Sequence, residues 1–236
     1  MKKLFVLIAA ACMTCTAAFA QTVKPFKEGE RAVFLGNSIT DGGHYHSYIW
    51  LYYMTRFPDM PIRVFNGGIG GDTAYDMNKR LDGDIFAMKP SVLMVTFGMN
   101  DSGYFEYNGD KPKEFGEQKY QESIKNYQQM EKRFKDLPDT RIVMVGTSPY
   151  DETVQLKENT PFKTKNETIK RLVEYQQESA AKNNWEFTDL NAPMTAINQQ
   201  YQQKDPTFTL CGSDRIHPDN DGHMVMAYLF LKAQGF

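Results

Sequence analysis

Cysteine is scarce in this chain, which has three in 236 residues. Cys12 and Cys15 lie within the first twenty residues, so removal of that segment leaves Cys211 alone. A single thiol excludes an intramolecular disulfide, and the remaining chain must therefore be stabilised by packing. About 210 residues suffice for one hydrophobic core of ordinary size, and we expect residues 21–236 to form a single domain.

Long apolar runs are also missing, because the longest is shorter than the roughly 20 residues that a membrane-spanning helix requires. Residues 1–20, MKKLFVLIAAACMTCTAAFA, carry two lysines, a short apolar run and the small-x-small pattern Ala18-Phe19-Ala20. This arrangement is typical of a secretory signal peptide, so we expect a secreted or periplasmic protein. A membrane anchor is the alternative interpretation of this segment. Lipid attachment at Cys15 is not indicated, because the residues before it lack the expected aliphatic residue. After signal cleavage we expect no stable membrane association.

Basic residues are not in excess. The chain has 27 Lys and Arg against 29 Asp and Glu, and removal of Lys2 and Lys3 leaves 25 against 29, a formal charge of −4. This balance gives no reason to expect nucleic acid or an anionic membrane surface as a partner.

Five short aliphatic runs are present, each bounded by Gly, Pro, Asn or Asp and without strict alternation, as expected of strands covered on both faces. They occupy residues 31–36, 62–68, 91–98, 141–148 and 185–190. Helical patterns separate them, the clearest with apolar residues three or four apart from Tyr120 to Leu137. Others begin near Ser47, Thr73, Thr164 and Asp219, and a shorter one follows Asn191. The alternation predicts a three-layer α/β/α fold with a parallel sheet of about five strands.

The expected strand ends carry most of the polar and glycine-rich segments. Ligands of an open parallel sheet bind outside the carboxyl ends of its strands. Three strands run into Gly36-Asn37-Ser38, Asn66-Gly67-Gly68-Ile69-Gly70-Gly71-Asp72-Thr73 and Gly98-Met99-Asn100-Asp101. A fourth segment, DRIHPDNDGH, places Asp214 and His217 three residues apart before the last helix. Residues 101–116 and 149–166 are predicted to be long loops, which are often functional in a compact domain.

Ser38, His217 and Asp214 are the residue types of a nucleophilic triad. A serine hydroxyl is a weak nucleophile until a base takes its proton, and an imidazole with a pKa near neutrality suits that task. His217 is the candidate base, and Asp214 can accept from its other ring nitrogen and fix its tautomer. A spacing of three lets both side chains project from one short turn.

The four segments LGNSIT, NGGIGGDT, FGMND and DRIHP resemble, in order, the four sequence blocks of the SGNH or GDSL hydrolase family. The resemblance covers essentially the whole chain after residue 20 and implies a flavodoxin-like sheet and ester hydrolysis through an acyl-serine, without metal or cofactor. It also implies an oxyanion hole made by the backbone N–H groups of Ser38 and Gly71 and the side-chain amide of Asn100. Asn37 stands where the family usually has aspartate, so the side chain beside the nucleophile is uncharged.

Taken one at a time, several of these residues also have purely structural interpretations. Ser38 alone could cap a helix, Asn100 could stabilise its own turn, and His217 could be a structural histidine. The glycines of residues 67–71 could cradle a phosphate, but no Lys follows them and the third glycine of a dinucleotide motif is missing. Residues 217–228 lack two essential carboxylates of a calcium loop.

Asp41, His44 and His46 could hold a metal, although we expect them to lie in or beside the pocket instead. His223 is expected to help seat the last helix.

The substrate is predicted from aromatic residues near the motifs. Tyr48 and Trp50 are expected in the core, whereas Tyr104, Phe105 and Tyr107 follow Asn100 in a predicted loop and can stack on sugar rings. Candidate substrate-binding residues are Asn37, Asp41, His44, Tyr104 and Phe105. The first hypothesis is a carbohydrate O-acetylesterase whose partner is an acylated glycan or another small ester. A lipolytic, lysophospholipase-like or general short-chain acyl esterase is the second, and a non-catalytic glycan-binding protein is the third.

Overall fold

The computed structural model describes residues 22–236, so the expected signal peptide, residues 1–20, lies outside the described residues. Five parallel strands form one sheet in the order β2-β1-β3-β4-β5. They are β1 (Arg31–Gly36), β2 (Arg63–Gly68), β3 (Val92–Val95), β4 (Arg141–Gly146) and β5 (Glu186–Asp189). This order is the flavodoxin-like one, in which the chain changes direction across the sheet beside β1. The predicted fold class is confirmed.

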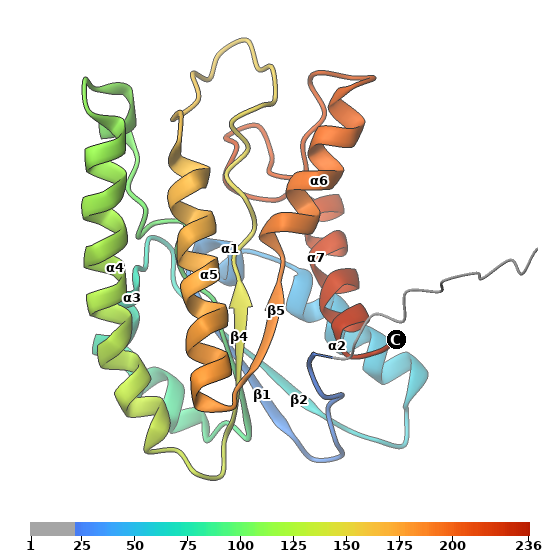
Figure 1. Cartoon of the computed structure of the whole chain (residues 1–236). Helices are drawn as coiled ribbons and strands as arrows, with labels where there is room; N and C mark the ends of the chain where they lie inside the picture. The colour runs from blue at the N-terminus through green and yellow to red at the C-terminus, as the bar shows by residue number, and fades with distance from the viewer. Residues whose placement is uncertain (1–21) are drawn as a thin grey trace, which may run out of the picture.

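Helices cover both faces of the sheet (Figure 1). They are α1 (Ser38–Asp41), α2 (Tyr45–Arg56), α3 (Ala74–Arg80), α4 (Pro112–Lys135), α5 (Lys165–Asn183), α6 (Asn191–Gln202) and α7 (Asn220–Ala233). Short π and 3-10 turns lie at Leu81–Ile85, Phe86–Met88 and Phe105–Asn108. Within the described residues, no helix is both long and apolar enough to cross a membrane.

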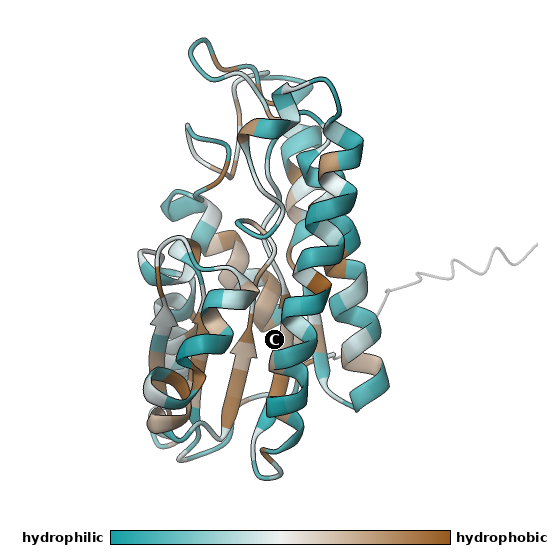
Figure 2. Cartoon of the chain, turned by 90° about the vertical axis from the view of Figure 1, so that its left-hand side faces the viewer, coloured by the Kyte–Doolittle hydropathy of each residue, from teal (hydrophilic) through white to brown (hydrophobic). Residues whose placement is uncertain are grey.

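Alternate strand residues face two separate apolar cores. Ala32 and Phe34 of β1 pack with residues of α2, α6 and α7, whereas Val33 and Leu35 pack with residues of α3 and α4. Figure 2 shows mainly hydrophobic strands behind helices whose outer faces are mainly hydrophilic. Because side chains alternate along a strand, a sheet covered on both faces requires apolar residues at consecutive positions, which explains the unbroken aliphatic runs.

Helix α4 begins earlier than the apolar pattern indicates. It starts at Pro112, a residue whose fixed φ suits the first turn, so the predicted loop 101–116 ends at Lys111. Gly116 in this first part is buried, and a Cβ added there would lie 2.6 Å from Thr168 Oγ1 of α5. The close approach of α5 buries a glycine rather than a large apolar side chain, so the sequence shows no helical period there.

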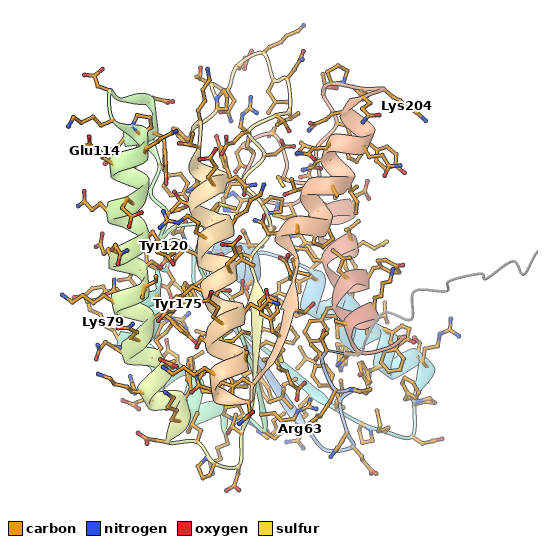
Figure 3. The ribbon with its side chains drawn as sticks, in the orientation of Figure 1. Arg63, Lys79, Glu114, Tyr120, Tyr175 and Lys204 are labelled. Carbon is orange, nitrogen blue, oxygen red and sulfur yellow. The ribbon has the colours of Figure 1, made fainter. Side chains whose placement is uncertain are left out.

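The strands end together at one end of the molecule. Figure 3 shows Arg63, at the start of β2, at the opposite end from Glu114 in the first turn of α4 and Lys204 beyond α6. The predicted loop 149–166 ends where α5 begins at Lys165 and contains no regular helix or strand. It lies above the sheet at the end where the strands stop (Figure 1).

Candidate active site

Ser38 is placed by the turn between β1 and α1. Asn37 is the N-cap of α1, and its Oδ1 accepts a hydrogen bond from the Ile39 backbone N–H at 3.0 Å. Ser38 is the first residue of the helix, where backbone N–H groups have no intrahelical acceptor. A Cβ at Gly36 would lie 2.1 Å from Thr40 Oγ1, which explains why the turn needs glycine there. Asn37 is only 1% exposed, so the structure corrects the expectation that it contacts substrate: it caps the helix that begins with Ser38.

His217 and Asp214 reach Ser38 from the turn before α7. The Ser38 Oγ lies 2.8 Å from His217 Nε2, and His217 Nδ1 lies 2.5 Å from Asp214 Oδ2. Asp214 Oδ1 accepts from the backbone N–H groups of Ile216 and His217, each at 2.9 Å. Asp214 therefore fixes its own turn and the histidine ring together, as the spacing of three predicts.

The hydrogen bond between His217 and Asp214 shifts the pKa of both side chains. The hydrogen bond to Asp214 raises the pKa of His217 above its ordinary value, and partial burial opposes the rise. Burial acts to raise the pKa of Asp214, but hydrogen bonds from the His217 side chain and backbone outweigh it, so the Asp214 pKa is lowered. Asp214 consequently stays ionised while His217 exchanges its proton.

Gly71 and Asn100 each have an N–H group that is able to donate. Gly71 has φ +85°, which favours glycine, and its backbone N–H finds no acceptor within residues 22–236. Asn100 Nδ2 donates to the Asp72 carbonyl oxygen at 2.9 Å, which leaves its second N–H for another acceptor. The Asn100 amide thus lies beside the peptide between Asp72 and Thr73.

Asp41 ties this glycine-rich segment to α1. Its Oδ2 accepts from the Gly70 backbone N–H at 3.2 Å, and its carbonyl oxygen accepts from Asn66 Nδ2 at 2.8 Å. A Cβ at Gly68 would lie 2.3 Å from the Asp41 nitrogen, so the two segments are in close contact. These bonds bring the segment that carries Gly71 to the helix that carries Ser38.

The two nearby histidines of the alternative metal site do not converge with each other. His46 Nε2 donates to the Thr40 carbonyl oxygen, whereas the exposed His44 ring packs against the rings of Tyr48 and His223. No group of three or more potential metal ligands is found among residues 22–236. His223 is buried beside Tyr45 with the two rings stacked, as expected of a residue that seats α7.

The aromatic residues after Asn100 divide into three environments. Tyr104 is partly buried, and its hydroxyl donates to Asn100 Oδ1 at 2.5 Å. Phe105 is 80% exposed and meets the ring of Phe162 edge-on at 5.6 Å. Tyr107 is buried, and its hydroxyl donates to the Ser102 carbonyl oxygen, so the expectation that it faces the pocket is wrong. Trp50 is exposed on α2 rather than in the core, which is a second correction.

Two buried cationic side chains near the site were not predicted from the sequence. Lys165 is fully buried, and burial lowers its pKa to about 7. Arg215, inside the Asp214–His217 turn, is 2% exposed and donates to carbonyl oxygens of the loop that precedes α5. Neither position carries a sequence signal of burial, since isolated Lys and Arg residues are normally exposed.

The assembled groups can perform acyl transfer. A base lies within hydrogen-bond distance of a hydroxyl, a carboxylate orients that base, and backbone and amide donors lie at the same strand ends. This is the set of groups that stabilises a tetrahedral oxyanion formed by serine attack on a carbonyl.

Residues 34–225 match the family described as GDSL-like lipase/acylhydrolase. The chain belongs to this family. The match covers more than half of the chain and includes all four segments that carry the resemblance.

The chain is similar to the acetylxylan esterase of Geobacillus stearothermophilus, with 27% identity over an alignment of 224 residues; the alignment covers 88% of this chain and 95% of the esterase. A solved structure of a catalytic mutant of that acetylxylan esterase has the same fold, with a TM-score of 0.70 and 23% identity over 89% of this chain and 96% of its own. Family and homology together identify this protein as a carboxylic ester hydrolase.

A solved structure of a gut microbial diltiazem-metabolizing enzyme is also similar, with a TM-score of 0.91 and 86% identity. The similarity covers 92% of this chain and 49% of that enzyme, so this chain spans about half the enzyme's length.

Proposed function

We propose that this hydrolase is an acetylesterase that removes O-acetyl groups from carbohydrate, or from a similarly bulky alcohol, through an acyl-serine intermediate on Ser38. The observation that carries the proposal is the contact of Ser38 Oγ with His217 Nε2 at 2.8 Å, with Asp214 behind the ring. In this role Ser38, His217 and Asp214 are the catalytic residues, and Ser38, Gly71 and Asn100 form the oxyanion hole.

The reaction has two halves. His217 takes the Ser38 proton while Oγ attacks the ester carbonyl, and the resulting oxyanion accepts hydrogen bonds from the backbone N–H groups of Ser38 and Gly71 and from the Asn100 amide. The carbon–oxygen bond to the alcohol then breaks, and His217 gives its proton to the departing alcohol. A water molecule deprotonated by His217 next attacks the acyl-serine, and acetate leaves as Ser38 regains a proton.

Two features support a large alcohol as the leaving group. The side chains of His217 and Asp214 are 47% and 46% exposed, so the site is open enough for a polymer or glycan to approach. The exposed ring of Phe105 offers a surface on which a sugar ring can stack. The similarity to a protein named as an acetylxylan esterase agrees with both features.

The test compares acyl length and substrate class. We expect aryl acetate to be hydrolysed with a higher kcat/KM than aryl octanoate, and acetate to be released from one of acetylated xylan, pectin or sialoglycan. Ser38→Ala should abolish both activities, and a serine-directed phosphonate should label Ser38. A preference for octanoate would favour the lipolytic hypothesis, and inertness toward every ester with retention of glycan would favour a binding protein.

Diltiazem is a second candidate substrate, because the diltiazem-metabolizing enzyme is 86% identical to this chain over the shared region. Incubation with diltiazem should convert its acetyl ester to the free alcohol with release of acetate, measured by mass spectrometry, and Ser38→Ala should give no such product. Unchanged diltiazem after prolonged incubation would exclude this substrate for this chain.

We also propose that residues 1–20 are a signal peptide and that the protein is secreted or periplasmic. The supporting observations are the two lysines, the short apolar run and Ala18-Phe19-Ala20. N-terminal sequencing of protein from the periplasm and from the medium should begin at Gln21. A first residue of Met1 in the purified protein would contradict the proposal.

A further inference from the structure

We propose that Tyr104 and Lys165 are positioning residues that set the orientation of the Asn100 amide toward Ser38. The inference deepens the proposed function, because it rests on the role of Asn100 as an oxyanion donor.

The orientation of the Asn100 amide is decided by its two neighbours. The Asp72 carbonyl oxygen can only accept, so the NH2 group of Asn100 must face it, at 2.9 Å. Asn100 Oδ1 therefore faces the Tyr104 hydroxyl, which must donate the 2.5 Å hydrogen bond. If the amide turned over, its oxygen would face the Asp72 carbonyl oxygen and that hydrogen bond would be lost, while its NH2 group would donate to the Tyr104 hydroxyl instead. Tyr104 and Asp72 thus leave one N–H of Asn100 in a fixed direction.

The Tyr104 hydroxyl remains a donor throughout the working pH range. Burial raises the pKa of this phenol well above its ordinary value, and the negative charges of Asp101 and Asp214 add to the rise. Because the phenol keeps its proton, the hydrogen bond to Asn100 does not depend on pH near neutrality.

Lys165 holds the turn on both sides of Asn100. Its Nζ donates to the carbonyl oxygens of Met99 at 2.7 Å and Gly103 at 2.5 Å, and to Ser102 Oγ at 2.6 Å. When protonated, the amino group uses all three of its N–H groups on one turn, with one acceptor just before Asn100 and two just after it.

Lys165 also contacts the ring that holds the Asn100 oxygen. Its Nζ lies 3.9 Å from the centroid of the Tyr104 ring, within the range of a cation–π interaction. The amino group therefore fixes the backbone that carries Asn100 and the phenol that orients its amide.

Burial of the Lys165 amino group is unfavourable in free energy, which indicates that this lysine has a specific role. Lys165 is fully buried and forms no ion pair with any carboxylate of residues 22–236. A buried ammonium that lacks an opposite charge in contact is destabilising, whereas a methionine of similar length would fill the same space without that cost. Lys165 is the first residue of α5, so it also links this turn to the end of the 149–164 loop.

The decisive experiment compares two Tyr→Phe variants on one loop. Tyr104→Phe removes the hydrogen bond to Asn100 and keeps the ring over Lys165. Tyr107→Phe is the matched control, because its hydroxyl donates to the Ser102 carbonyl oxygen of the same turn without contacting Asn100. We expect Tyr104→Phe to lower kcat for aryl acetate by about tenfold with KM nearly unchanged, and Tyr107→Phe to leave kcat within about twofold.

A double-mutant cycle shows whether Tyr104 acts through Asn100. In an Asn100→Ala background, Tyr104→Phe should cause no further loss of kcat. An equal loss in both backgrounds, or an unchanged kcat in Tyr104→Phe alone, would overturn the positioning role. If instead Asn100→Ala keeps full kcat, then Asn100 is not an oxyanion donor and that part of the proposed function is wrong. This result differs from the ones that would overturn only the positioning role of Tyr104.

Lys165→Met tests the second proposed positioning residue. We expect it to lower kcat by about tenfold or more with little change in KM, and to slow phosphonate labelling of Ser38 in parallel, because the phosphonyl oxygen occupies the same donors. A folded Lys165→Met variant with normal kcat and labelling would remove Lys165 from the proposal. If that variant does not fold, the Tyr104→Phe cycle still decides the role of the hydroxyl.

Discussion

Arg80 and Asp72 form a largely buried ion pair behind the proposed oxyanion donors. Arg80 Nε lies 2.6 Å from Asp72 Oδ2, with the two side chains 13% and 10% exposed. Arg80 Nη2 also donates to the carbonyl oxygens of Gly36 and Gly67, at the ends of β1 and β2. The same Asp72 supplies the carbonyl oxygen that accepts from Asn100. One guanidinium thus connects two strand ends to the segment that holds the site.

Arg80→Met should lower the free energy of unfolding by about 3 kcal/mol, because it leaves the Asp72 carboxylate buried without its partner. Urea denaturation followed by circular dichroism measures the change. Lys111→Met is the control, since Lys111 and Glu114 form an exposed pair and its loss should cost about 0.5 kcal/mol or less. Equal effects of the two substitutions would show that the Arg80 pair contributes no more than a surface contact.

Asn100→Ala should lower kcat for aryl acetate by about 100- to 1000-fold with little change in KM, because the lost donor acts on charge that develops only in the transition state. Asn108→Ala, an exposed asparagine on the same loop, should leave both constants unchanged. Steady-state kinetics at fixed pH decides the matter. Equal changes in kcat and KM would assign Asn100 to substrate binding instead.

The pH profile should report the interaction of Asp214 with His217. The base must be neutral to act, and the hydrogen bond that His217 donates to Asp214 raises the pKa of His217, so activity should fall as pH decreases through that raised value. Asp214→Asn removes the negative charge and should move the acidic limb of kcat/KM to lower pH. The plateau should also drop by about 1000-fold or more. An acidic limb that stays in place in Asp214→Asn would show that another group controls it.

Cys211 should be inert in the folded protein. The thiol is fully buried, it donates to the Pro149 carbonyl oxygen at 3.2 Å, and burial raises its pKa to about 12. In protein that begins at residue 22, a maleimide at neutral pH should label Cys211 only after denaturant is added, because thiolate and access are both absent. A variant carrying Ser47→Cys, on an exposed position of α2, should label at once. Rapid labelling of Cys211 without denaturant would contradict its burial.

Local patterns were sufficient for the strands and for the catalytic turn. Five aliphatic runs predicted the five strands, although β3 ends at Val95 where the run to residue 98 predicted a longer strand. Asp214 and His217 were predictable because the four residues of one turn, 214–217, contain the pair and its backbone hydrogen bonds.

Long-range contacts outside the four family segments were not predictable from the sequence. Lys165 is 66 residues from Met99, whose carbonyl oxygen it binds, and no local pattern of charge or hydrophobicity indicates that contact. The first turns of α4 were assigned to a loop because Gly116 and its polar neighbours hide the helical period. Asn37 was predicted to contact substrate because it precedes Ser38 in the sequence. In the structure its side chain instead accepts from the Ile39 backbone N–H and caps α1.

Arg215 has a consequence for engineering of this enzyme. Its guanidinium binds the carbonyl oxygens of Asp151, Val154 and Asn159 and so clamps the base of the loop to the turn that carries His217. The tip between Val154 and Asn159 includes the exposed residues Lys157 and Glu158. A peptide grafted between these two residues would be presented beside the active site from a fixed base, which makes this tip a suitable position for exchanging substrate-recognition segments.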